Sequence, residues 1–107
     1  MLVQLFFGTA LIVLCVINHA LCLELLLRRL KEHGQKWELK FPVFGHVVFM
    51  IVVVLGLFMA HTIEAWIWAI FYRFAGETES LAEAVYFSTV TFTTLGFGDV
   101  VLSDDWR

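Results

Sequence analysis

The sequence has 107 residues, of which 61% are hydrophobic and 16% charged, and its net charge is −3. A chain this apolar is not a soluble domain, so the composition indicates a membrane protein embedded in a lipid bilayer. The sequence has no basic surface for a nucleic acid, no phosphate-binding loop, no nucleophile paired with a base and no zinc-ligand spacing. We therefore expect no enzymatic activity, no cofactor and no nucleic-acid partner.

The first apolar stretch, residues 1–23, is long enough to cross a hydrocarbon core of about 30 Å. A secretory signal peptide is also apolar, but a basic region should precede its apolar core and none does. The sequence therefore predicts a transmembrane helix over residues 1–27. Within it, Asn18 and His19 are expected to form hydrogen bonds to a neighbouring helix.

Residues 28–42 carry most of the positive charge and are predicted to be a loop between two spans. By the positive-inside rule this loop is cytoplasmic, which places the following span in the inside-to-outside direction across the cell (inner) membrane. Glu24 and Arg28, four residues apart, are expected to form a local ion pair. Five of the seven basic residues lie in this loop: Arg28, Arg29, Lys31, Lys36 and Lys40.

A second apolar stretch follows at residues 41–60. The β-branched run at 47–54 favours a strand by propensity, but the length of the stretch favours a helix. Aromatic residues at its outer end fit the belt that membrane proteins place at the bilayer surface. These residues are Trp66, Trp68 and Tyr72.

His61 and Glu64 stand three apart, so they should share one face of the second helix. They are either a proton-sensitive pair or ordinary interfacial hydrogen-bonding groups, and a metal site would need further ligands. The acidic residues Glu77 and Glu79, further along the chain, also have two possible interpretations. They either concentrate cations at an outer mouth or keep an exposed loop in water.

Ser80 and Glu83 have the spacing of a capping box, with a serine N-cap and a glutamate three residues later. The sequence therefore predicts a short, aromatic-rich helix over residues 81–93. The carboxyl end of such a helix carries partial negative charge, which suits a cation close to it.

The segment 91–99 reads Thr-Phe-Thr-Thr-Leu-Gly-Phe-Gly-Asp. Gly96 and Gly98 alternate with Leu95 and Phe97, so successive carbonyl oxygens can face one side while the larger side chains pack behind. An ordinary glycine-aspartate turn is the simpler alternative. The short helix, the threonine pair and the glycine alternation together favour a re-entrant loop.

These residues resemble the pore-loop potassium channel family, whose module consists of an outer helix, a pore loop and an inner helix. The resemblance covers about residues 43–99. It implies an all-α membrane protein with two transmembrane helices, a re-entrant pore helix and an extended selectivity-filter loop. The implied divisions are an additional N-terminal helix at 1–27 and a partial pore domain at 43–107, with outer helix 43–74, turret 75–80, pore helix 81–93 and filter 94–99.

The resemblance also implies which residues form the ion-coordinating site. Backbone carbonyls, with one threonine hydroxyl, would coordinate K⁺ as the permeant ion, and no structural metal is implied. Two side chains differ from the commonest pattern, because a leucine replaces a valine and a phenylalanine replaces a tyrosine, but neither change removes a carbonyl ligand. The ion-coordinating residues would be Thr94, Leu95, Gly96, Phe97 and Gly98, supported by Asp99, Tyr86 and Thr93.

A filter is a ring of four loops, so one loop per chain implies a homotetramer with its mouth on the outer side. The function expected is that of a potassium-selective channel subunit. Alternatives are a non-conducting regulatory or interaction subunit in the membrane, and a nonselective cation channel. Residues 100–107 are too few for the inner helix, so we expect a fragment of a longer protein, with a naturally truncated subunit as the alternative.

Overall fold

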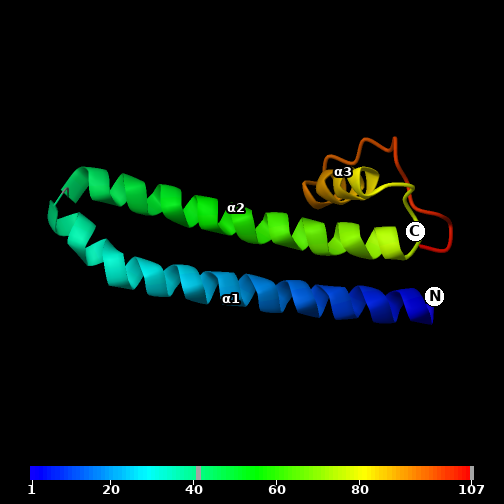
Figure 1. Cartoon of the computed structure of the whole chain (residues 1–107), viewed down its shortest axis with the longest axis horizontal. Coiled ribbons are helices and arrows are strands. Elements are labelled where there is room, and N and C mark those ends of the chain that lie inside the picture. Colours follow the sequence, from blue (N-terminus) through cyan, green and yellow to red (C-terminus); the bar gives the residue numbers. More distant parts are fainter. Residues whose placement is uncertain (41, 107) are drawn as a thin grey trace. The chain divides into compact units, whose positions relative to one another are not determined.

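The computed structural model describes residues 1–40 and 42–106, without the side chains at 37 and 38. Its helices are α1 (Leu2–Lys40), α2 (Pro42–Phe74) and α3 (Leu81–Phe92), and the described residues contain no strand (Figure 1). The most apolar windows of α1 and α2 have mean hydropathies of 2.4 and 2.6, so both helices could cross a membrane. The predicted all-helical architecture is confirmed, and the β-branched run at 47–54 is helical.

The structure differs from the predicted loop at 28–42, because α1 continues as a helix to Lys40. Residues 28–40 are rich in Leu, Arg, Lys and Glu, which are strong helix formers, and no proline interrupts them. The predicted ion pair also supports this helix, with 2.8 Å between Arg28 Nε and Glu24 Oε1. Proline is well tolerated at the first position of a helix, which is where Pro42 lies in α2.

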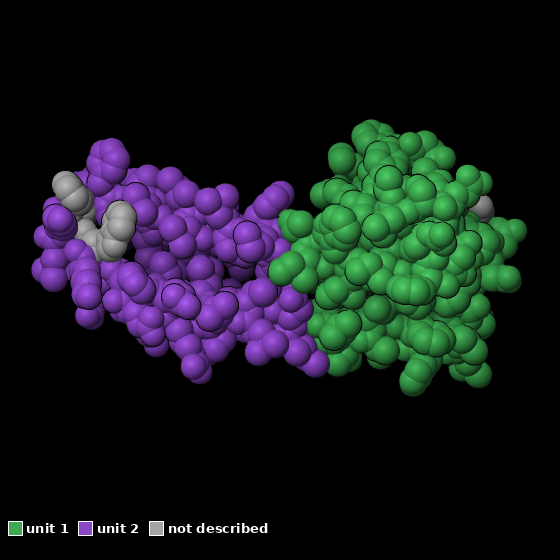
Figure 2. All heavy atoms as spheres, in the orientation of Figure 1, with its two compact units in different colours: residues 1–15, 62–107 green, residues 16–61 purple. Residues whose placement is uncertain are grey.

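The chain forms two compact units, each of which contains part of α1 and part of α2 (Figure 2). In the unit of residues 16–61, small residues let the two helices approach closely. A Cβ added at Gly56 would lie 2.9 Å from Leu26 Cδ2. Asn18 Nδ2 donates a hydrogen bond to the carbonyl oxygen of Ala60 at 3.4 Å, which confirms its predicted interhelical bond.

The other unit comprises residues 1–15 and those from Thr62 onward. Here α2 and α3 each bury small residues spaced four apart, the pattern by which membrane helices pack closely. Ser88 Oγ donates a hydrogen bond to the carbonyl oxygen of Ala65 at 2.6 Å. Four small residues of these two helices are buried: Ala65 and Ala69 of α2 and Ala84 and Ser88 of α3.

Aromatic rings surround this contact in edge-on or tilted pairs, the arrangement that their quadrupoles favour. Tyr72 lies against Phe87 of α3, with 5.2 Å between ring centroids. Phe71 lies against Trp106, near the end of the described chain, at 5.4 Å. Tyr72 therefore helps to attach α3, and its place in an aromatic belt stays a prediction.

Candidate functional site

The N-terminus of α3 has the predicted cap. Ser80 is the N-cap with extended backbone, φ −137° and ψ 160°, and its Oγ accepts a hydrogen bond from the Glu83 amide at 3.1 Å. Glu83 Oε2 in turn accepts from the amide of Glu79 at 2.8 Å, one residue before the N-cap. Two amides that would otherwise lack partners are thus satisfied, which fixes where α3 begins.

The C-terminus of α3 ends in a Schellman motif that leads directly into segment 94–99. Thr93 is the C-cap. The Thr94 amide donates to the Thr91 carbonyl at 3.0 Å, and the Leu95 amide donates to the Val90 carbonyl at 3.0 Å. This bonding pattern satisfies the last helix carbonyls and reverses the chain. The helix itself ends at Phe92, one residue before the predicted boundary.

Thr94 occupies the position in this motif that usually holds glycine. Its φ is +62°, and it is the one non-glycine residue with positive φ in the described chain. A β-branched residue rarely adopts this conformation, which costs about 1–3 kcal/mol and persists where the surrounding structure enforces it. Such strain clusters at functional sites.

The sign of φ alternates along the segment. Thr94, Gly96 and Gly98 have φ of +62°, +52° and +75°, while Leu95 and Phe97 do not have positive φ. Alternation of this kind is the backbone pattern that can turn successive amides toward one side and leave the carbonyl oxygens on the other. The amides of Leu95 and Gly96 both point back to the Val90 carbonyl.

The carbonyl oxygens of residues 94–98 accept no hydrogen bond from any residue that the structure describes. A row of carbonyls without donors can serve as a set of cation ligands. The side chains of Leu95 and Phe97, predicted to pack behind the row, are 62% and 67% exposed in the single chain. Within one chain they therefore have little to pack against.

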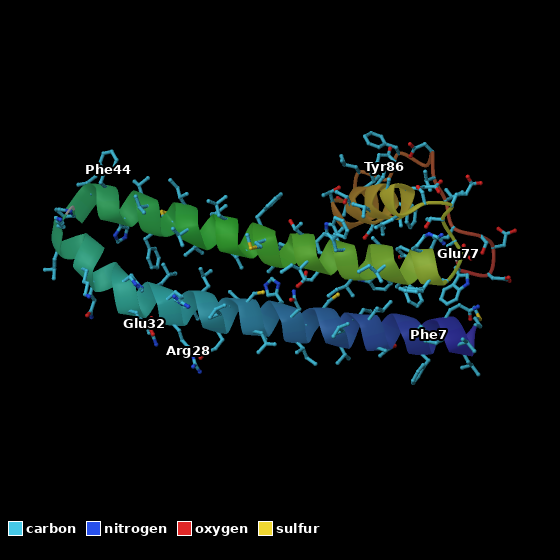
Figure 3. The ribbon with its side chains drawn as sticks, viewed as in Figure 1. Phe7, Arg28, Glu32, Phe44, Glu77 and Tyr86 are labelled. Atoms are coloured by element: carbon cyan, nitrogen blue, oxygen red, sulfur yellow. The ribbon has the colours of Figure 1, made fainter. Side chains whose placement is uncertain are left out.

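Two of the three residues predicted to support the segment, Tyr86 and Asp99, lie together. Tyr86 Oη, on α3 (Figure 3), donates a hydrogen bond to Asp99 Oδ2 at 2.7 Å. This bond, helped by the amides of Asp99 and Val100, lowers the pKa of Asp99 below its usual value. The same bond raises the pKa of the Tyr86 phenol, because ionisation would remove the donated proton.

We expect Tyr86→Phe to raise the pKa of Asp99 toward its usual value, about 3.9, because the ring remains and the donor is lost. In the unaltered chain, the stabilisation from this bond is present above the unfolded-state pKa and disappears as pH falls through the lower folded-state value. Carbon NMR of the Asp99 carboxyl group during an acid titration measures this shift. Tyr72→Phe, at the other tyrosine, is the control and should leave the Asp99 titration unchanged; an equal shift in both variants would contradict the assignment.

The chain beyond Asp99 is held by a residue whose part the sequence does not reveal. Glu77 accepts two hydrogen bonds from Ser103, from its amide at 2.7 Å and from its hydroxyl at 2.8 Å. The Glu77 carboxylate therefore connects the segment before α3 to the chain beyond Asp99. No sequence pattern indicated this contact, because 26 residues separate the two partners.

His61 and Glu64 are the residues of α2 that the sequence suggested as a proton-sensitive pair. The His61 ring lies 5.1 Å from that of His19, on α1, within the unit of residues 16–61. Glu64 is buried, although its position near the membrane surface suggested access to water. A special role for His61 and Glu64 stays a prediction, and the neighbouring histidine is a feature that sequence spacing could not reveal.

Two long apolar helices with a third, short helix and an irregular carbonyl-bearing segment define an all-α membrane protein. A family model described as ion channel matches residues 47–107, more than half of the chain. The chain belongs to this ion channel family, which indicates the function of an ion channel. No significant match was found among curated proteins or solved structures.

Proposed function

We propose that this chain is a subunit of a potassium-selective channel and that the carbonyl oxygens of residues 94–98, with the Thr94 hydroxyl, coordinate K⁺. The supporting observation is the row of carbonyls without hydrogen-bond donors, on a backbone whose φ alternates in sign. K⁺ must exchange its water shell for protein oxygens to enter a narrow filter, and such a row supplies them.

The same proposal requires four chains, because one row of carbonyls can surround only part of an ion. The high exposure of Leu95 and Phe97 is consistent with this, since neighbouring subunits would give them surfaces to pack on. Two ties would hold the ends of the loop in each subunit: Tyr86 to Asp99, and Glu77 to Ser103.

We also propose an orientation, in which the basic end of α1, residues 28–40, faces the cytoplasm of the cell membrane. The positive-inside rule supports this orientation. The segment 94–99 then lies toward the outer side. Thr93, as the C-cap of α3, supports the entrance to the segment by a hydrogen bond from its Oγ1 to the Thr89 carbonyl at 2.7 Å.

Ion flux from liposomes tests the proposal. The full-length gene product is reconstituted with K⁺ or Na⁺ inside, and the charge-balancing uptake of protons is followed with a fluorescent dye. We expect flux with K⁺ that exceeds flux with Na⁺ by at least tenfold. Comparable fluxes would replace the proposal with a nonselective cation channel. Folded tetramers without flux would replace it with a non-conducting regulatory subunit.

A further inference from the structure

A cavity lies between α1 and α2 in the unit of residues 16–61, far along the chain from segment 94–99. Its volume is 410 Å³. Figure 2 shows this unit in purple. The apolar part of the lining consists of Leu30, Gly34, Gly45, Val48, Phe49 and Val52, and Arg29 and His33 complete it.

A second hollow of 560 Å³ adjoins the first. It shares Leu30, Gly34 and Phe49 with the first cavity and adds Lys31 at its edge. Gly34 therefore borders both hollows. No heavy atom lies within 4 Å of a Cβ built at Gly34, so the space beside it is open. The missing side chain thus leaves room where the two hollows meet.

The two neighbouring arginines of α1 have different surroundings. Arg28 is paired with Glu24, and its side chain points away from α2 (Figure 3). Arg29 lines the cavity, and it has no ion-pair partner among the residues whose side chains the structure describes. A guanidinium group at the edge of an apolar cavity favours an anion, and it binds phosphate well.

We propose that the two hollows bind the acyl chains of an anionic phospholipid and that Arg29 binds its phosphate. The apolar linings match hydrocarbon chains, and the guanidinium group of Arg29, which has no ion-pair partner among the described side chains, matches the phosphate of the headgroup. Both helices are long and apolar enough to span a bilayer. In a bilayer the hollows between them would be surrounded by phospholipids at high concentration. Basic pockets between membrane helices are suited to such headgroups. The proposal does not depend on ion conduction.

Native mass spectrometry of the full-length protein in detergent tests the proposal. The protein is titrated with phosphatidylglycerol or with phosphatidylcholine of the same acyl chains, and bound lipid is counted per chain. We expect phosphatidylglycerol to bind at least tenfold more tightly, because the two lipids differ in net charge but not in their chains. Equal binding of the two lipids, or displacement of phosphatidylglycerol by inorganic phosphate alone, would overturn the proposal.

Two matched pairs of variants locate the site. Gly34→Leu should fill the junction of the hollows and abolish the tight binding, whereas Gly8→Leu, which also places a side chain in open space on α1, should not. Arg29→Gln should weaken phosphatidylglycerol binding about five- to tenfold, as expected for one cationic group near a lipid headgroup. Arg28→Gln should have less than a twofold effect. An equal loss in both arginine variants would show a diffuse surface charge and overturn the site.

Discussion

Gly96→Ala is expected to abolish K⁺-selective flux in the liposome assay. Gly96 has φ +52°, and an L residue with a Cβ pays about 1–2 kcal/mol in this region. In a tetramer the cost falls on all four chains at one ring, about 4–8 kcal/mol in total. Rotation of the peptide relieves that cost and moves a carbonyl oxygen out of the row, so the ion loses a ligand at this level.

Gly76→Ala is the matched control for this variant. Gly76 has φ +77°, and no heavy atom lies within 4 Å of an added Cβ at either glycine. Both substitutions therefore introduce backbone strain without a clash, but Gly76 lies between α2 and α3 and outside the carbonyl row. We expect Gly76→Ala to retain K⁺ flux. Retained selective flux in Gly96→Ala, or equal losses in both variants, would contradict the assignment of the carbonyl row.

Ala84→Leu is expected to destabilise the attachment of α3 to α2. Ala84 and Ala69 are both 0% exposed, so a larger side chain at position 84 has no free space. Overpacking of this kind costs about 1–3 kcal/mol. Separation of the helices would also break the bond from Ser88 to the Ala65 carbonyl, worth about 0.6 kcal/mol in a membrane protein.

The thermal unfolding midpoint of the protein in detergent, followed by circular dichroism, measures this loss. Ala82→Leu is the control, because it makes the same substitution on the same helix at an exposed position. Exposed substitutions usually change stability by less than about 0.5 kcal/mol. An Ala84→Leu midpoint equal to that of Ala82→Leu would show that α3 does not depend on close packing at Ala84.

Local signals in the sequence predicted the ends of α3 well. Ser80 and Glu83 are three residues apart, and the bond between them forms within one turn of helix. The glycines at 96 and 98 have the positive φ that their position in the motif implied. These features depend on neighbouring residues, so a reading of adjacent positions is sufficient to find them.

The prediction for residues 28–42 failed for a different reason. High charge indicated a boundary of the membrane, and the boundary was interpreted as a loop. Charged residues such as Arg, Lys and Glu are also strong helix formers, so α1 continues to Lys40. Charge thus indicated the expected environment of this segment but not its backbone conformation.

The apolar spans, the helix cap at Ser80 and the glycine pattern of segment 94–99 can be read directly from the sequence, because hydropathy, capping and backbone freedom are properties of single residues and close neighbours. The packing of the folded chain is needed to show that Ser103 binds Glu77, that Arg29 and not Arg28 borders a cavity, and that Ala69 and Ala84 are both fully buried. Such contacts depend on how separate helices and loops pack. No local pattern encodes which distant residue will fill a given space.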